Sequence, residues 1–88
     1  AYDRVAQGGT WVVEDNATAP GIGEEERRYH QAAGVIAWVD VPLVKKGRPV
    51  AVLCVVDDRP RAWTAAEVGL IEEVAERCWA AVERARAE

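Results

Sequence analysis

Two runs of apolar, largely β-branched residues occupy the middle of the chain and predict a pair of adjacent strands. They cover residues 35–44 and 50–56, and a polar segment, Lys45-Lys46-Gly47-Arg48-Pro49, joins them. A short polar connection that contains Gly between two such runs is typical of a β-hairpin. Because Pro42 has no N–H for a strand ladder, it favours an edge position or a bulge at that point.

Both faces of this predicted hairpin are largely apolar. In the first run, one face carries the odd-numbered residues from Val35 to Leu43, and the other carries Ile36, Trp38 and Val44. In the second run, Val50, Val52, Cys54 and Val56 alternate with Ala51, Leu53 and Val55. Strands that are apolar on both faces are normally covered on both faces, so we expect both sides of the hairpin to be buried.

The part of the chain before the hairpin predicts a strand, a loop and a short helix. Residues 10–15 are mostly β-branched or aromatic and follow Gly8-Gly9, so they predict a short strand. Residues 16–23 contain Asn, Thr, Pro and two Gly, which is typical of a loop. Residues 24–33 are good helix formers that begin with three acids, and Gly34 follows as a C-terminal stop.

The last part of the chain predicts a long helix. Thr64 and Glu67 have the spacing of a capping box, and Trp63 and Val68 have the spacing of a hydrophobic staple. An apolar seam follows with alternating spacings of three and four residues, as in a coiled coil: Val68, Ile71, Ala75, Cys78, Val82 and Ala85.

This seam is wider than one sheet face requires. Leu70, Val74 and Ala81 extend it to about half of the helix circumference, so we expect the helix to serve two surfaces. Neither Gly nor Pro ends the helix before Glu88, and the chain begins at Ala1 without Met. We therefore expect the helix to continue in a longer protein, of which this chain is a segment.

Composition and charge narrow the class of protein. With 88 residues, the chain holds one domain at most. A formal net charge of −4 argues against nucleic-acid binding, which needs a basic stripe. No apolar run approaches the roughly 18 residues that cross a bilayer, so we expect no membrane insertion in this segment. Nine Arg against two Lys, with abundant Ala and Val, indicate a high-GC bacterium.

The two cysteines lie within apolar patterns rather than in a loop framework. This placement of Cys54 and Cys78 suits a reducing compartment, and we expect a cytoplasmic protein. Redox sensing is one interpretation of these thiols. The simpler interpretation is that both are small buried hydrophobic residues.

The residues that carry chemistry are few. The chain has no Ser and one His, so a Ser nucleophile is impossible and no nucleophile–base set is evident. His30 is either a ligand contact or proton carrier, or a surface residue of the short helix. Without a second His or a nearby Cys it has no metal-ligand set, and we expect no metal. We therefore expect this chain not to be an enzyme.

Several segments together resemble the GAF family of sensor domains, in particular those that precede PAS and kinase modules in bacterial sensor histidine kinases. They are residues 41–53 (VPLVKKGRPVAVL), 60–67 (PRAWTAAE) and 72–85 (EEVAERCWAAVERA). Residues 34–43 (GVIAWVDVPL) are similar to the central strand of the family, and residues 10–15 (TWVVED) to an earlier strand. The resemblance covers nearly the whole chain.

The resemblance implies an α+β fold, with an antiparallel sheet of about three strands, one short helix and a long C-terminal helix. A full GAF domain has further N-terminal elements, so residues 1–88 would form a single partial domain. In it, residues 1–63 would supply the sheet, loop and short helix, and residues 64–88 the signalling helix. The Cys-His pair that anchors a bilin has no counterpart at Tyr29-His30, and the cyclic-nucleotide constellation is absent. We therefore expect no such cofactor.

By resemblance, the chain is a regulatory domain of a two-component sensor histidine kinase, a transferase whose catalytic domains lie outside it. Alternate strand residues would line a pocket for an unknown small molecule, and Trp11, Trp38 and His30 are the candidate contacts. A homodimer would form through the signalling helix, at Ile71, Val74, Ala75, Cys78, Val82 and Ala85. The alternative is a dimerisation or interaction module that binds no ligand.

Overall fold

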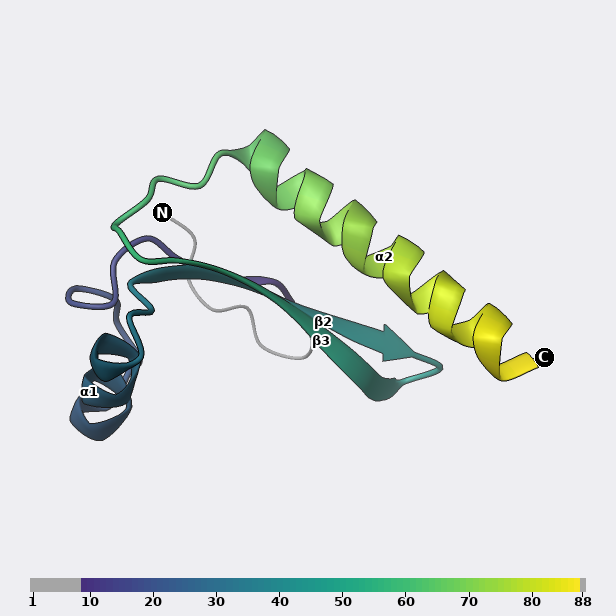
Figure 1. The fold of residues 1–88 in the computed structure, drawn as a ribbon, viewed down its shortest axis with the longest axis horizontal. Coiled ribbons are helices and arrows are strands. Elements are labelled where there is room, and N and C mark those ends of the chain that lie inside the picture. The colour runs from purple at the N-terminus through teal and green to yellow at the C-terminus, as the bar shows by residue number, and fades with distance from the viewer. Residues whose placement is uncertain (1–8, 88) are drawn as a thin grey trace.

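The computed structural model describes residues 9–87, which form a three-stranded antiparallel sheet and two helices (Figure 1). Along the chain the elements are β1 (Trp11–Val13), α1 (Glu24–Ala32), β2 (Ala37–Lys45), β3 (Arg48–Asp57) and α2 (Ala65–Ala87). The strand order is β1-β2-β3, so β2 is the central strand. The long helix α2 lies along one face of the sheet, and α1 lies at the end remote from the β2–β3 turn (Figure 1). The α+β expectation is confirmed.

The hairpin turn is tighter than the sequence suggests. Lys45 pairs with Arg48, so only Lys46 and Gly47 connect the strands, and both have positive φ, 54° and 75°. Two positive φ values are the signature of a type I′ turn, whose twist matches that of the strands. The expected connection of residues 45–49 was therefore too long by three residues. The register shifts between Leu43 and Val44, so the extra residue of a bulge is Val50 on β3, whereas Pro42 itself pairs regularly with Val52.

One face of the sheet, which we call the inner face, packs against α2 and forms the main core. The buried residues of this core are Val12, Ala37, Val39, Val41, Leu43, Trp63, Val68 and Ala75. Leu53, Val55, Ile71 and Trp79 are partly buried against it. The strand residues in this set alternate in sequence, which is the period that places side chains on one face of a sheet.

The end of α1 and the start of α2 are each formed by a local hydrogen-bond motif. At the end of α1, Gly34 has φ 76°, and its N–H donates to the carbonyl of Gln31 while that of Val35 donates to His30. This pair of bonds is a Schellman motif, so Gly34 is the stop that the sequence predicts. At the start of α2, the Thr64 N–H donates to Glu67 Oε1 and the Glu67 N–H donates to Thr64 Oγ1, which confirms the capping box.

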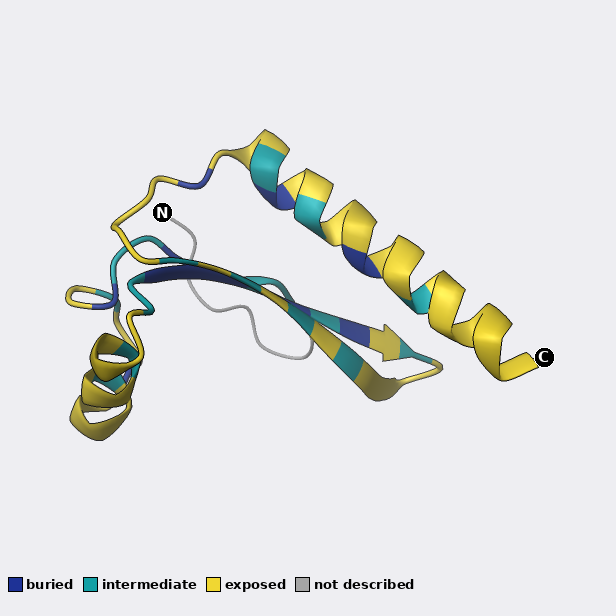
Figure 2. Cartoon of the chain, in the orientation of Figure 1, coloured by how far each residue is buried: buried dark blue, intermediate teal, exposed yellow. Residues whose placement is uncertain are grey.

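The opposite, outer face of the sheet is covered only in part, which corrects one expectation. Val52 and Val56 are 59% and 56% exposed, and the thiol-bearing Cys54 between them is also exposed (Figure 2). The reason is geometric: α1 and the loop before it pack near Trp38 and Val13 and do not extend along β3. The prediction that the hairpin is buried on both sides was wrong for β3.

The side of α2 that packs on the sheet uses part of the predicted seam and one residue outside it, Trp79. Val68 and Ala75 are buried, Ile71 and Trp79 are partly buried against the core, and Cys78, Val82 and Ala85 are exposed. A helix that lies on a sheet buries only a narrow stripe of side chains. Here the stripe runs from Val68 to Trp79 with spacings of three, four and four residues, so Trp79 rather than Cys78 packs on the sheet. The prediction that both cysteines are buried was therefore wrong.

Candidate functional site

Trp11, His30 and Trp38 come together on the outer face, and we call them the aromatic cluster. The Trp11 and Trp38 rings lie edge to face, with centroids 5.5 Å apart and planes at 86°. The His30 ring lies 4.4 Å from the Trp38 ring, centroid to centroid. Edge-to-face contact is a favoured arrangement of aromatic rings. Three elements, β1, α1 and β2, thus supply one residue each to the cluster.

The cluster is embedded in a small second core. Val13, Ile22 and Trp38 are buried, and Trp11, Ala19 and Val35 are partly buried against them. Trp38 is 3% exposed, whereas Trp11 is half-buried and Tyr29, beside His30 on α1, is 72% exposed. A molecule that reached this face would therefore meet Trp11 directly and would contact Trp38 only after a rearrangement.

Asn16 connects the loop, the helix and the sheet beneath this cluster. It is 3% exposed, its N–H donates to the Ile36 carbonyl (2.7 Å), and its Nδ2 donates to the Arg27 carbonyl (3.0 Å). Its Oδ1 lies 3.1 Å from His30 Nδ1. Because that oxygen can only accept, the network assigns the proton to Nδ1 of His30. The Nε2 atom of the same ring lies 3.8 Å from a carboxylate oxygen of Glu26.

Arg27 fastens the loop to α1. Its guanidinium donates to the backbone carbonyls of Asn16, Ala19 (3.1 Å) and Ile22 (3.2 Å). A planar guanidinium with five donors suits several carbonyls at once. The sequence analysis overlooked both Arg27 and Asn16. The sequence did contain one signal. The loop has apolar residues to bury and few side chains that can donate hydrogen bonds to its carbonyls, and Arg27 is the nearby residue that can do so.

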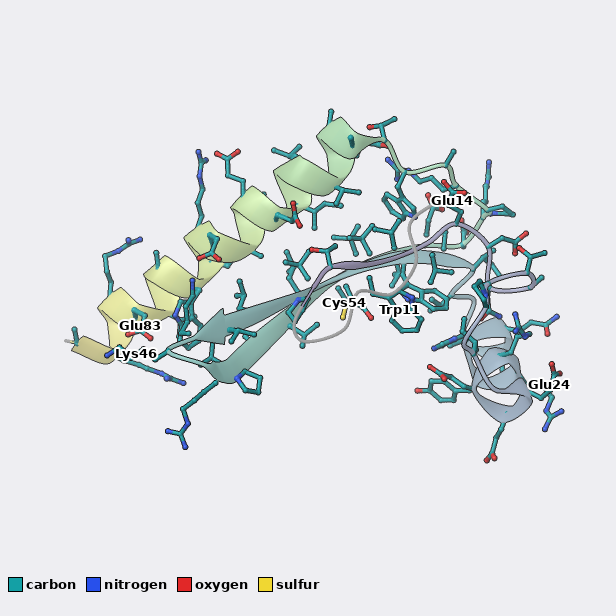
Figure 3. The ribbon with its side chains drawn as sticks, turned by 180° about the vertical axis from the view of Figure 1, so that it is seen from behind. Trp11, Glu14, Glu24, Lys46, Cys54 and Glu83 are labelled. Carbon is teal, nitrogen blue, oxygen red and sulfur yellow. The ribbon has the colours of Figure 1, made fainter. Side chains whose placement is uncertain are left out.

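A row of three cross-strand neighbours runs from the cluster across the outer face to β3. Trp11 pairs with Asp40 and Asp40 pairs with Cys54, so the register puts the three side chains next to one another on one face. Figure 3 labels the two outer members, Trp11 and Cys54. Partial burial, followed by the hydrogen bond to Asp40 and the charge of Asp40, raises the pKa of Cys54 to about 11. The reactive form of a cysteine is the thiolate, so this thiol is poorly suited to redox sensing at neutral pH.

The outer-face cluster is joined to the start of α2 through β1. Val13 packs in the second core, and its carbonyl accepts a hydrogen bond from Trp63 Nε1 at 3.0 Å. Trp63 in turn packs in the main core with Val68 of α2. A single residue of β1 thus contacts the cluster with its side chain and the helix anchor with its backbone.

Arg61 reinforces this connection. Its backbone N–H donates to the Glu14 carbonyl at 2.9 Å, and its guanidinium lies 4.3 Å above the Trp63 ring. The same guanidinium pairs with Asp57 at the end of β3 and with Glu67 in the first turn of α2. The Thr64 N–H bond to Glu67, and then Arg61, hold the pKa of the Glu67 carboxyl below its usual value.

On α2, the six predicted signalling residues divide between the side that packs on the sheet and the exposed surface. Ile71 and Ala75 face the sheet, whereas the other four are exposed: Val74, Cys78, Val82 and Ala85. Leu70, at 61% exposure, extends the exposed set toward the start of the helix. Leu70, Val74, Cys78, Ala81 and Ala85 are spaced three and four residues apart and are exposed, so they form a second apolar stripe on the flank of α2, next to the side that packs on the sheet.

The described part of the chain offers no assembled metal site. Within residues 9–87, no three His, Cys, Asp or Glu side chains lie together as a group that could hold a metal ion. In the same residues, α2 is the longest helix, and none has the length and apolarity to span a bilayer.

The chain is similar to known proteins in both sequence and structure. Residues 2–82 match the GAF domain family. No curated protein matches. A solved domain assigned to a two-component sensor histidine kinase of Sinorhizobium meliloti 1021 is similar in fold, with a TM-score of 0.82 at 23% identity. The match covers 99% of this chain and 59% of that one.

Two further solved structures are photoreceptor domains. GAF3 of Slr1393 from Synechocystis sp. PCC6803, in its photoproduct state, has a TM-score of 0.81 at 22% identity over 91% of this chain and 51% of that one. NpR6012g4, a red/green cyanobacteriochrome in its red light-absorbing state, has a TM-score of 0.79 at 23% identity. That match covers 93% of this chain and 53% of NpR6012g4. This chain thus spans little more than half the length of the structures it resembles.

Proposed function

We propose that this chain, which belongs to the GAF domain family, senses a small molecule at the outer face of its sheet and passes the signal to α2. The observation that carries the proposal is the Trp63–Val13 hydrogen bond. It joins the second core, which holds the aromatic cluster, to the core under α2. A change at one core is therefore expected to alter the other.

The aromatic cluster is the proposed site of sensing. Its three residues come from separate elements, so a ligand that moves α1 relative to the sheet changes all their contacts at once. Trp11 offers a partly exposed indole, with Asp40 as its cross-strand neighbour. Asn16 and Arg27 hold α1 and the loop in place, which gives the site a defined resting state.

The second stripe of α2 is the proposed output surface. Val74, Cys78 and Ala85 of this stripe are exposed, as is Val82 beside it, and their spacings of three and four residues suit a helix of a second copy. In this proposal Ile71 and Ala75 anchor the helix to its own sheet rather than to the partner. Residues 64–88 then form the signalling part of one partial domain, and residues 1–63 the sensing part.

The parent protein in this proposal is a cytoplasmic bacterial histidine kinase of a two-component system. The support is the similarity to the Sinorhizobium meliloti domain, together with the motifs of the sequence. The chain itself would be non-catalytic and would need no bilin, cyclic nucleotide or metal. It would bind neither nucleic acid nor membrane.

A second candidate function is a ligand-free interaction module that sets dimer geometry. It is favoured by the burial of Trp38, which already packs against Trp11, His30 and the second core. A filled cluster can stabilise the fold without any ligand. The two candidates differ in one property, namely whether the outer face gains stability from a small molecule.

Intrinsic fluorescence and thermal unfolding, recorded with a panel of amino acids, carboxylic acids and nucleosides, separate these candidates. A ligand that binds only the folded state raises the melting temperature, and at 100-fold excess over its Kd it adds about 2.7 kcal/mol. The effect should vanish in Trp11→Ala and persist in Trp79→Phe, a control on the other face of the sheet. If no compound shifts either signal, the interaction module is the correct candidate.

A further inference from the structure

Asp40 places a carboxylate on a part of the outer face that is otherwise uncharged. Its neighbours on this face along β2 are Trp38 and Pro42, and its cross-strand neighbours are Trp11 and Cys54. The Cys54 thiol is uncharged at neutral pH, because its pKa is raised to about 11. Asp40 itself is half-buried. Partial burial of a carboxylate among such groups is unfavourable unless the charge is paired, so this position is not explained by folding alone.

The partner of Asp40 within the sheet is a weak one. The Cys54 thiol donates a hydrogen bond to the Asp40 carboxylate, and a thiol is a poor donor. None of the ion pairs formed within residues 9–87 includes Asp40. By contrast, Asp57 at the end of β3 pairs with Arg61. Since an ionised carboxylate has about four acceptor sites, Asp40 retains the capacity to bind a further donor.

Trp11 forms an aromatic wall next to this carboxylate. Residues directly opposite each other on antiparallel strands have Cβ atoms about 4.5–5.5 Å apart, so one small group can contact both Asp40 and Trp11. Edge-to-face packing against Trp38, with ring centroids 5.5 Å apart, holds the Trp11 indole in place. An indole attracts a cation that lies within about 6 Å of its centroid. A carboxylate beside an indole therefore suits an ammonium group.

We propose that the small molecule bound at the outer face is an organic amine, whose ammonium group pairs with the Asp40 carboxylate and lies against Trp11. This inference rests on the proposed function, because it identifies the class of ligand that is sensed. An anionic ligand does not fit, since the charge of Asp40 repels it. A metal ion does not fit either, because within residues 9–87 no group of three His, Cys, Asp or Glu assembles around this carboxylate.

Six compounds, which combine two ring skeletons with three charge states, test the ligand class. They are benzylamine, benzyl alcohol and benzoate, and 2-phenylethylamine, 2-phenylethanol and phenylacetate. Titration at pH 7, followed by the nuclear magnetic resonance shift of the Trp11 indole N–H, measures each affinity. At least one amine should bind about tenfold or more tightly than its alcohol, because hydrogen bonds to charged groups are the stronger ones. The proposal is overturned if neither amine binds, or if the alcohols or acids bind as tightly.

A matched pair of variants tests the role of Asp40. Asp40→Asn keeps the size of the side chain and removes its charge, so amine affinity should fall about tenfold. Asp58→Asn removes the same charge from an exposed site, where the Asp58 side chain is 79% exposed, and should leave amine affinity unchanged. Equal weakening by the two variants overturns the proposal, since the net charge of the chain would then attract the amine.

The stability of Asp40→Asn gives an independent readout. If Asp40 is retained for binding, its replacement should not lower the midpoint of urea denaturation, because an Asn side chain also accepts the hydrogen bond from Cys54. Circular dichroism measures this midpoint without any ligand. A clearly lower midpoint overturns the proposal, because the carboxylate would then be paired within the folded chain and serve its stability.

Failure of the ligand class and failure of the proposed function give different results. If an alcohol or an acid binds in wild type and not in Trp11→Ala, while neither amine binds, the ligand class is overturned and sensing at the outer face is retained. Amine binding that requires Asp40 supports the ligand class. If that binding leaves hydrogen exchange at the Val68 amide of α2 unchanged, transmission to the helix is contradicted while the ligand class holds.

Discussion

The two faces of the sheet are built from similar residues and have different surroundings. On β2, Val39 of the inner face is fully buried under α2, whereas Val44 of the outer face is 42% exposed. On β3, Leu53 packs against the core and its neighbour Val52 does not. A pattern of apolar residues therefore determines which side chains can be buried, and the arrangement of the helices determines which ones are.

The outer face has two parts, and the difference between them has functional meaning. Near Trp38 it is covered by α1 and the loop, with Asn16 and Arg27 as the polar connections. Along β3 it is open to solvent. In the proposed function, the covered part is where a ligand would alter the packing of α1 against the sheet.

The largest contrast should appear in paired valine truncations on β2. Val39→Ala leaves a cavity in the main core and should lower the free energy of unfolding by about 2 kcal/mol. Val44→Ala should change it by less than about 0.5 kcal/mol, as for most exposed positions. Urea denaturation monitored by circular dichroism measures both. Equal losses would mean that the outer face is as well packed as the inner one.

The connection between the two faces should be the next most sensitive feature. Trp63→Phe keeps most of the ring volume but removes the indole donor to the Val13 carbonyl. The expected loss is about 0.5–1.5 kcal/mol, the usual net contribution of one intramolecular hydrogen bond. The same urea titration checks this value. A loss below about 0.5 kcal/mol would show that the hydrogen bond contributes little to joining the two cores.

The capping box at the start of α2, on the inner face of the sheet, should contribute less to the free energy of unfolding. Thr64→Ala removes the acceptor for the Glu67 N–H and should destabilise the protein by about 1 kcal/mol. Thr64→Ser retains the hydroxyl and serves as the control. If both variants unfold at the same urea concentration, the cap is not a determinant of where α2 begins.

Glu67 gives the same helix start a pH dependence. Its pKa is lowered in the folded state, first by the Thr64 N–H and then by Arg61, so the ionised form stabilises the fold. That contribution is present above the unfolded pKa and is lost as the pH falls through the folded one. Stability should therefore decline on acidification below about pH 4.5 more in wild type than in Glu67→Gln. Parallel profiles would contradict this assignment.

The smallest expected effect on the fold concerns Cys54 on the open outer face, where the reactivity of the thiol is measured. Its pKa of about 11 implies roughly 100-fold less thiolate near pH 8 than at the ordinary value of 9.0. Alkylation by iodoacetamide should accordingly be slow relative to Cys78, with mass spectrometry of tryptic peptides as the readout. Asp40→Asn should accelerate the reaction only in part, because burial is the larger cause. Equal rates at both cysteines would contradict the raised pKa.

Local features were predictable from the sequence because a few adjacent residues determine them. The capping box at Thr64 and Glu67, the stop at Gly34 and the hairpin around Gly47 are each specified within about six residues. The α+β class followed from the periodicities and the family resemblance. The aromatic residues Trp11, Trp38 and His30 were singled out separately, and the structure brings them together.

What could not be predicted depends on how distant elements pack. The sequence does not show that α1 stops short of β3, so the exposure of Cys54 and Val56 was missed. It also does not show the angle at which α2 crosses the sheet, which selects Trp79 rather than Cys78 for the interface. Asn16 and Arg27 were missed for a related reason, since their partners are backbone carbonyls, which every sequence has.

Hydrogen exchange at the Val68 amide, which donates to Thr64 in the first turn of α2, tests most directly whether the aromatic cluster communicates with the helix. His30→Ala perturbs the cluster without contacting α2. We expect it to change the exchange rate of this amide at least about fivefold in wild type, and by less than about twofold in the Trp63→Phe background. The same change in both backgrounds, or none in either, would contradict the proposed route from the outer face to α2.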